Sequence, residues 1–384
     1  MLWLDITDPK YALFFSAFLP RLLELDSILI TTRESPNYTE CARILSKVES
    51  SYAKKDVRLQ ICSVGGYGGA DKLGKYHARV QREQEFLSLF GKIGTPRVFM
   101  SGASVEGAQC AFGLGIPIVH FADTPIAGHA YDPKDITALA RLSIPLSSVL
   151  FHPFVIPSSV FSGFGLESSN VYSYDFIDIA LWLDSSSSIS SSILPSFITQ
   201  SSLPNAIPLI IAREEEYKAH YVKAQYRLWY ESVHLLAQER VRLLIIPRYD
   251  TSQLEAEFGA YSNVQIAQDI IAPHDLYAHA SLLLGGGGTM NLEACFLGIP
   301  TISTRSLLLY HDCYLLEHKL MRHAKSVEEV LQAFYAYRDS GFARKDSKAL
   351  FIKPNHLNTP KNTLKDALEN SLHSIVQTIA TRFY

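Results

Sequence analysis

The chain has 384 residues, which is too long for one ordinary hydrophobic core and suits two domains. Hydrophobic residues make up 47% of the chain and charged residues 19%, a balance that excludes a disordered protein and allows two sizeable cores. The formal net charge is -3 and no long run of basic residues occurs, so nucleic acid is not expected as a partner.

Apolar runs alternate with helix-period segments in the first half of the chain, a pattern typical of a doubly wound parallel sheet. The predicted strands are Leu2–Ile6, Ser27–Thr32, Arg58–Val64, Arg97–Ser101, Ile116–Ala122 and Ser148–His152. The predicted helices are Tyr11–Leu25, Glu40–Ser50, Lys72–Phe90 and Gly102–Gly113. The first helix contains large apolar residues over 11–20, which indicate either core packing or an exposed surface for a lipid.

The pattern loosens over about residues 155–208, and the serine-rich segment 185–203 is predicted to be a solvated loop. A second doubly wound sheet follows. Its predicted strands are Leu209–Ala212, Val241–Pro247, Val264–Ala267, Leu282–Gly285 and Thr301–Ser303. Its predicted helices are Glu215–Glu239, Leu254–Tyr261, Leu276–Ala280, Thr289–Leu297, Tyr314–Leu320 and Val327–Arg338, with a last amphipathic helix at Lys361–Arg382. The expected domains are residues 1–160 and 161–355, and residues 356–384 are expected to pack back across the two lobes.

The most informative segment is a glycine-rich turn that ends a predicted strand and opens a helix. Glycines at Gly286, Gly287 and Gly288 let backbone N–H groups approach a ligand, and the start of the helix favours an anion there. Thr289 is expected to cap the helix, and Glu293 to accept hydrogen bonds from a ribose diol. The alternative is a plain strand-to-helix turn. Because ligands bind at the carboxyl ends of strands in open α/β sheets, we interpret the turn as a nucleotide-diphosphate site.

Three segments resemble the DUF354 family, which is placed with the GT-B glycosyltransferases and the UDP-N-acetylglucosamine 2-epimerases. They are WLDITDPKYALFF at residues 3–15, AFGLGIPIVHFADTP at residues 111–125 and GGGTMNLEACFLGIPTIS at residues 286–303. The resemblance implies a GT-B fold, that is, two Rossmann-like doubly wound domains facing a central cleft. It further implies a nucleotide diphosphate sugar on the C-terminal lobe, with no metal and no other cofactor.

The resemblance also supplies positions at which epimerase and transferase chemistry differ. The 2-epimerases carry acidic residues in two N-lobe segments and a histidine before an arginine in the C-lobe. This chain has Ala103, Ala122 and Ala212 at those places. Because abstraction of the proton at the sugar C2 needs groups within hydrogen-bond reach, the alanines favour glycosyl transfer.

Further site residues are expected at the carboxyl ends of other strands. Arg213 is expected to hold the diphosphate, or else to be a surface residue paired with the acidic run that follows it, and Arg305 is a second candidate for the diphosphate. His274 is expected to contact the nucleobase or to cap a helix. For the catalytic base we favour Asp123 over Asp8, which can equally be only a helix N-cap.

The function expected from these residues and the resemblance is a metal-independent glycosyltransferase of surface polysaccharide biosynthesis. It would move a sugar from a nucleotide diphosphate sugar, with a UDP-sugar favoured, to a glycan or lipid-linked acceptor. The five cysteines are odd in number and widely spaced, which favours a reducing cytoplasm, and contact with the inner face of the membrane is left open. The alternatives are a sugar-nucleotide 2-epimerase and a non-catalytic GT-B binding protein.

Overall fold

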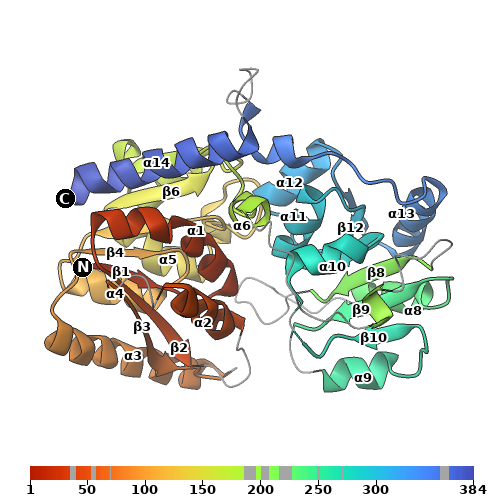
Figure 1. Cartoon of the computed structure of the whole chain (residues 1–384), viewed down its shortest axis with the longest axis horizontal. Helices are drawn as coiled ribbons and strands as arrows, with labels where there is room; N and C mark the ends of the chain where they lie inside the picture. The colour runs from red at the N-terminus through yellow and green to blue at the C-terminus, as the bar shows by residue number, and fades with distance from the viewer. Residues whose placement is uncertain are drawn as a thin grey trace. The chain divides into compact units, whose positions relative to one another are not determined.

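The computed structural model describes residues 1–34, 40–52, 58–69, 71–185, 196–199, 207–215, 227–248, 251–269, 271–354 and 363–384. The chain divides into two compact units, each with its own parallel sheet (Figure 1). The first unit comprises Met1–Ala127, Tyr131–Asp178 and Thr359–Tyr384. The second comprises Gly128–Ala130 and Ile179–Asn358.

The first unit is built on a seven-stranded parallel sheet with the order β3-β2-β1-β4-β5-β6-β7. Its strands are β1 (Leu2–Asp5), β2 (Ile28–Glu34), β3 (Leu59–Gly66), β4 (Val98–Ser101), β5 (Ile118–Phe121), β6 (Val149–Pro153) and β7 (Val171–Tyr174). Strands β1 and β4 are neighbours, and from them the chain winds outward in opposite directions. All six strands predicted for this half are present. Strand β7 was missed because it is short and only half buried.

Helices cover both faces of the first sheet. They are α1 (Pro9–Leu25), α2 (Glu40–Tyr52), α3 (Lys72–Ile93), α4 (Val105–Gly113) and α5 (Ala138–Ser143). On one face, Trp3 packs against Phe86 and Phe90 of α3. On the other face, α1 places Phe14 and Phe15 around Phe121. The aromatic residues of α1 are therefore core, so the lipid-contact alternative for this segment is wrong in the described structure.

The second unit is built on a six-stranded parallel sheet with the order β10-β9-β8-β11-β12-β13. Its strands are β8 (Leu209–Arg213), β9 (Arg242–Ile246), β10 (Val264–Ile266), β11 (Leu282–Gly285), β12 (Thr301–Ser303) and β13 (Arg322–His323). Its helices are α6 (Ala180–Ser185), α7 (Ser196–Thr199), α8 (Leu228–Leu236), α9 (Ser252–Phe258), α10 (Pro273–His279), α11 (Gly288–Phe296), α12 (Tyr310–Glu317) and α13 (Val327–Asp339). The five strands predicted here are confirmed, whereas the two-residue strand β13 was missed.

Alternate residues of these strands face two separate cores, as the period of a β-strand requires. Ile210 and Leu284 face α8, α9 and α13. Leu209 and Leu283 face α7, α10 and α11. The helix predicted over 215–239 is seen only as α8, because residues 216–226 lie outside the described part. Most of the predicted serine-rich loop lies outside it as well, but Ser196–Thr199 within that segment forms helix α7 with Ile198 buried, so the prediction of a solvated loop is wrong there.

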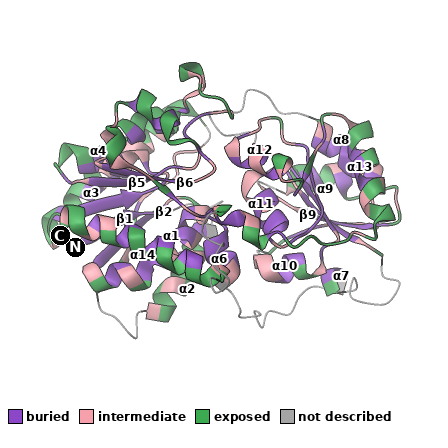
Figure 2. Ribbon diagram, turned by 90° about the horizontal axis from the view of Figure 1, so that it is seen from above, coloured by how far each residue is buried: buried purple, intermediate pink, exposed green. Residues whose placement is uncertain are grey.

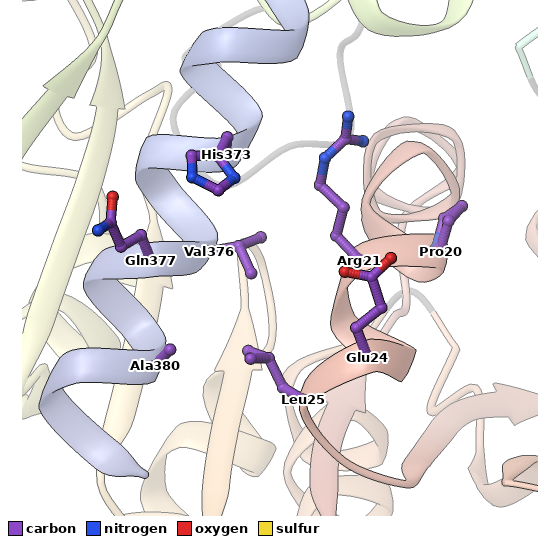
Figure 3. A pocket seen from close by; sticks show the side chains of 8 residues that line it. All are labelled: Pro20, Arg21, Glu24, Leu25, His373, Val376, Gln377 and Ala380. Atoms are coloured by element: carbon purple, nitrogen blue, oxygen red, sulfur yellow. The ribbon is translucent and has the colours of Figure 1, made fainter.

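The C-terminal helix α14 (Leu364–Phe383) belongs to the first unit and packs along α1. Its buried face includes Leu372, Ile375 and Ile379, and Arg21 of α1 forms an ion pair with Glu369. Between the two helices lies a hollow of about 470 Å³, into which Leu25 and Val376 project (Figure 3).

The expected domain boundary at residue 160 is therefore wrong. The first unit continues to Asp178 because β7 hydrogen-bonds to the edge of its sheet, and the C-terminal helix returns to this unit because its apolar face is buried there. The pattern of burial shows that each unit has its own buried sheet and its own core residues (Figure 2). Within the described residues, no helix has the length and apolar character needed to cross a membrane.

Candidate functional site

The glycine-rich turn lies where the second sheet changes its winding direction. Strands β8 and β11 are neighbours, with Gly285 opposite Arg213, and from this pair the sheet is built outward on both sides. The N–H of Gly286 donates to the carbonyl of Arg213 over 2.8 Å, which locks the turn to the end of β8. In open α/β sheets such a switch point is the usual place for a ligand.

The first two glycines of the turn are required by close packing. A Cβ on Gly285 would lie 1.7 Å from Oδ1 of the buried Asn291, and one on Gly286 would lie 2.6 Å from the backbone N of Glu215. None of the four glycines has a positive φ, so left-handed backbone is not the reason for them. The glycines instead let α11 begin directly against the end of β8.

Helix α11 begins at Gly288 with Gly287 as its N-cap, and no side chain caps it. The expected cap, Thr289, is therefore corrected: it is the second residue of the helix, because the helix starts one residue earlier than predicted. The first N–H groups of a helix lack partners within the helix and carry the positive end of its dipole. The uncapped first turn is thus suited to an anion.

Three arginines surround this first turn. A Cβ on Gly287 would lie 2.7 Å from Nη2 of Arg248 and 3.5 Å from Cγ of Arg213, and one on Gly288 would lie 3.1 Å from Nη1 of Arg305. Nη1 of Arg213 donates to the carbonyl of Pro247 over 2.6 Å, and Arg305 forms an ion pair with Asp312. Arg213 ends β8, and Arg248 and Arg305 follow β9 and β12. The guanidinium groups of Arg248 and Arg305 lie against the turn, whereas Arg213 passes it with its Cγ and binds the end of β9 with its guanidinium.

Arg248 was not predicted, although the sequence carries a signal for it. It follows β9, the neighbour of β8 in the sheet, and the carboxyl ends of parallel strands share one edge. The surface-pair alternative for Arg213 was based on the acidic run after it. The two described residues of that run bind other groups in the structure: Glu214 accepts from the hydroxyl of Tyr230, and Glu215 accepts from the backbone N of Ser306 over 2.7 Å.

Glu293 lies in the second turn of α11 and is buried. Its Oε1 accepts from Nε1 of Trp182 in α6 over 3.1 Å, and its Oε2 accepts from the hydroxyl of Tyr277 in α10 over 3.5 Å. Burial, together with the charge of Glu293, raises the pKa of Tyr277 well above its usual value, so Tyr277 stays a neutral donor. The Tyr277 hydroxyl has a closer acceptor in the carbonyl of Met290, 3.1 Å away, so Trp182 of α6 is the main donor that orients the carboxylate.

His274 lies in the first turn of α10, but Ala272 is the N-cap of that helix. The helix-cap alternative for His274 is therefore wrong. Its Nε2 lies 2.8 Å from the carbonyl oxygen of Leu183 in α6, so Nε2 carries the proton and the ring holds α6 against α10.

The two candidate bases lie at strand ends of the first unit in different surroundings. Asp8 is exposed and is the N-cap of α1, where its Oδ1 accepts from the backbone N of Lys10 over 2.8 Å. Asp123 follows β5. It forms an ion pair with Lys10, and its Oδ1 accepts from the hydroxyl of Tyr11 over 3.1 Å. The structure thus gives Asp8 the capping role named as its alternative.

Asp123 belongs to a partly buried cluster around the ammonium group of Lys10. Nζ of Lys10 also lies 2.6 Å from Oδ2 of Asp178, whose Oδ1 accepts from the hydroxyl of Tyr174 over 2.6 Å. Burial alone would lower the pKa of Lys10, but the two carboxylates outweigh it and raise the pKa above its usual value. Lys10 is therefore a permanent cation that neutralises part of the charge on two carboxylates.

Three alanines stand at the positions expected to distinguish epimerisation from glycosyl transfer, and they lie at strand ends of the two sheets. Ala103 follows β4, Ala122 follows β5 and Ala212 lies within β8. Next to one of them, His120 in β5 is buried, and burial lowers its pKa to about 4 even though the charge of Asp123 acts in the opposite direction.

Comparison with family models matches residues 1–353 to the family described as "Protein of unknown function (DUF354)". The chain belongs to this family. This DUF354 protein is 25% identical over 334 residues to the uncharacterized protein MJ0665 of Methanocaldococcus jannaschii, a match that covers 86% of this chain and 89% of the relative.

Solved structures with the same fold include enzymes that act on nucleotide sugars. The UDP-GlcNAc 2-epimerase of Neisseria meningitidis bound to UDP-GlcNAc has a TM-score of 0.71 at 13% identity and covers 100% of both chains. A variant of Os79 from O. sativa in complex with UDP has a TM-score of 0.62 at 12% identity, again over 100% of both chains. The DUF354 protein therefore has the GT-B-like fold of two Rossmann-like domains.

Proposed function

We propose that this protein is a nucleotide-sugar enzyme that binds the diphosphate of its donor at the first turn of α11. The observation that carries the proposal is the position of the Arg248 and Arg305 guanidinium groups, with the side chain of Arg213 beside them, at an uncapped helix start on a sheet switch point. Backbone N–H groups of Gly287, Gly288 and Thr289 would bind phosphate oxygens, and the guanidinium groups would neutralise their charge. The UDP named for both structural neighbours supports a uridine donor.

Glu293 would bind the ribose and His274 would lie near the nucleobase, both on the helices that flank the turn. Since Glu293 already accepts from Trp182, its carboxylate is oriented before any ligand arrives. A pre-oriented acceptor loses less entropy on binding, which favours a specific ribose contact.

The proposed reaction is transfer of the sugar to a hydroxyl of a glycan or lipid-linked acceptor. The acceptor oxygen attacks C1 of the sugar, the bond from C1 to the diphosphate oxygen breaks, and Asp123 takes the hydroxyl proton. The positive groups at α11 stabilise the departing diphosphate. The alanines at 103, 122 and 212 support transfer over epimerisation.

A 2-epimerase is the second candidate, and its support is the likeness of the whole fold to UDP-GlcNAc 2-epimerases. The two are separated by incubating the protein with UDP-GlcNAc in heavy water without an acceptor. Deuterium at the sugar C2 supports the epimerase. UDP release that requires an added acceptor supports the transferase. Binding of the nucleotide sugar with neither reaction supports a non-catalytic binding protein.

Donor binding itself is tested by calorimetric titration of UDP into the protein and into the Arg248→Met variant. Loss of one charge-assisted contact, about 1.5–3 kcal/mol, lowers the affinity about 10-fold to 100-fold. Arg338→Met is the matched control, because Arg338 lies in α13 of the same unit and pairs with Glu239. Equal loss in both variants, or no binding of UDP, CMP, GDP or ADP to the unaltered protein, contradicts the proposal.

A further inference from the structure

One ammonium group and two carboxylates meet in the first unit, and two phenol groups contact them. Nζ of Lys10, in the first turn of α1, forms ion pairs with Asp123 and with Asp178, which lies between β7 and α6. The hydroxyl of Tyr11 donates to Oδ1 of Asp123 over 3.1 Å, and that of Tyr174 donates to Oδ1 of Asp178 over 2.6 Å. Each carboxylate is thus contacted by the ammonium group and by one phenol.

The two carboxylates differ in their access to solvent. The side chain of Asp178 is 3% exposed, whereas that of Asp123 is 25% exposed. A ligand hydroxyl can therefore reach Asp123 but not Asp178. Because a buried carboxylate is costly unless it is paired, the partner that holds Asp178 in place is Lys10.

The charges of the cluster suit the uptake of one proton. Lys10 supplies one positive charge and the carboxylates supply two negative charges, so one negative charge is uncompensated until Asp123 takes a proton. After that step Lys10 is still paired with Asp178. Burial and the charges of the two carboxylates raise the pKa of Tyr11 well above its usual value. Burial and the charge of Asp178 do the same for Tyr174, so neither phenol releases a proton.

We propose that Lys10 and Asp178 are positioning residues that act through Asp123 in the proposed transfer reaction. Lys10 holds the carboxylate of Asp123 in one place. Asp178 gives Lys10 a second partner, so the ammonium group stays in position when Asp123 takes the proton of the acceptor hydroxyl and loses its charge. This role rests on the proposed function, because it needs Asp123 as the base.

Lys10 and Asp178 have opposite effects on the proton affinity of Asp123. The positive charge of Lys10 favours the ionised carboxylate, and the negative charge of Asp178 disfavours it. A purely structural role of both residues would not produce effects of opposite sign. Further titratable groups that interact with the cluster stay in place in every variant below; they are Asp8, Tyr11, His120 and Tyr174.

The first experiment follows the side-chain carboxyl carbon of Asp123 by carbon NMR while the pH is varied. It uses the full chain made with isotope-labelled aspartate and no ligand, and the signal is identified by its loss in Asp123→Asn. Lys10→Met should move the titration midpoint to higher pH, and Asp178→Asn should move it to lower pH. Lys10→Arg keeps the charge and should titrate close to the unaltered protein.

Asp5→Asn is the matched control for Asp178→Asn. Asp5 is also buried in the first unit, accepts from the hydroxyl of Thr31 over 2.6 Å and is paired with a cation, Arg82. Its substitution should leave the midpoint of Asp123 in place. Asp178→Asn keeps an acceptor for Tyr174 and removes only the charge, so this comparison holds even where Lys10→Met does not fold.

The second experiment measures the pH dependence of UDP release from UDP-GlcNAc with water as the acceptor. A base must be ionised to take a proton, so the rate falls as the pH drops through the midpoint of Asp123. This acid limb should move to higher pH in Lys10→Met and to lower pH in Asp178→Asn, in step with the NMR midpoints.

NMR midpoints that stay in place, or that move in the same direction in Lys10→Met and Asp178→Asn, overturn the inference. An acid limb that does not follow the NMR midpoints overturns it as well. Opposite NMR shifts in a protein that releases no UDP contradict the proposed reaction with this donor, while they support the coupling of Lys10 and Asp178 to Asp123.

Discussion

At the scale of single residues, the glycine-rich turn shows why glycine is needed where no unusual backbone conformation exists. Gly285 lies under the amide of Asn291, and that amide also donates to Oγ of Ser303 over 3.1 Å. The bond ties α11 to β12 at the point where the turn begins. Glycine is therefore needed at position 285 because a Cβ has no room there, and not because of the backbone angle φ.

We predict that Gly285→Ala lowers the free energy of unfolding by about 1–3 kcal/mol, because the added methyl group displaces a buried amide. Gly91→Ala is the matched control: it lies in α3 with nothing near its Cβ, and it should raise the free energy of unfolding by about 0.5–1 kcal/mol. Urea unfolding measures both. Equal effects of the two substitutions would show that crowding at Asn291 is not the reason for glycine.

A second prediction at this scale concerns His120. Burial lowers its pKa to about 4 from an ordinary value of 6.5, so below pH 6.5 the unfolded chain binds a proton that the folded chain does not. The free energy of unfolding should therefore fall as the pH falls from 6.5 to 4, by about 3 kcal/mol from this residue. The His120→Gln variant should lack this contribution to the pH dependence of the free energy of unfolding when urea unfolding is measured from pH 6.5 to 4. Parallel pH profiles for the two proteins would contradict the assignment.

A third prediction concerns Asp123, whose carboxylate contacts Lys10 and Tyr11. If Asp123 takes the acceptor proton, Asp123→Asn should lower the turnover number about 100-fold to 10,000-fold and leave the affinity for UDP unchanged. Asp8→Asn is the control, because an Asn side chain can still cap α1 and the turnover number should stay unchanged. Initial rates of UDP release check this. Equal turnover in Asp123→Asn and the unaltered protein rules out Asp123 as the base.

At the scale of elements, the C-terminal helix is as much a part of the first core as the helices between its strands. Residues 363–384 follow the whole second unit in sequence, yet α14 buries Leu372, Ile375 and Ile379 in the first. The hydroxyl of Tyr384 donates to Asp26 over 3.1 Å, which fixes the end of the helix to the end of α1.

We predict that Ile379→Ala lowers the free energy of unfolding of the first unit by about 2–4 kcal/mol, because it leaves a cavity at a fully buried position. Ser374→Ala, on the exposed side of the same helix, should change it by less than about 0.5 kcal/mol. Fluorescence of Trp3 in the first core follows the unfolding in chains whose other two tryptophans are phenylalanine. A small effect of Ile379→Ala would mean that α14 is dispensable for this core.

At the scale of the whole molecule, each unit has its own sheet and its own buried clusters. The chain contains three tryptophans, and they divide between the units: Trp3 lies in the first, and Trp182 and Trp229 lie in the second. A ligand that binds only the folded second unit stabilises it by RT ln(1 + L/Kd), where L is the free ligand concentration.

We therefore predict that UDP at 100 times its dissociation constant stabilises the second unit by about 2.7 kcal/mol. In a Trp3→Phe chain, the thermal transition seen by tryptophan fluorescence should move upward. In a chain that keeps only Trp3, with UDP at 100 times the dissociation constant measured for that chain, the transition should move less. A larger shift in the second chain would place the nucleotide site on the first unit.

The sequence by itself determined the two doubly wound sheets and the position of the glycine-rich turn. Strand period, helix period and turn residues are local properties, so β1 to β6 and β8 to β12 could be predicted within a few residues. Short edge strands such as β7 and β13 could not be predicted, because they are recognised by their hydrogen bonds to a neighbouring strand and not by their residue composition.

Only the tertiary structure decided which distant side chains meet. Arg248 lies beside Arg213 at α11 because β9 and β8 are adjacent. Trp182 and Tyr277 contact Glu293 because α6 and α10 flank it. Lys10 contacts both Asp123 and Asp178, so three segments of the first unit meet there. It also returned the C-terminal helix to the first core. Each of these contacts joins residues far apart in the chain, and no local pattern of residues encodes such a distance.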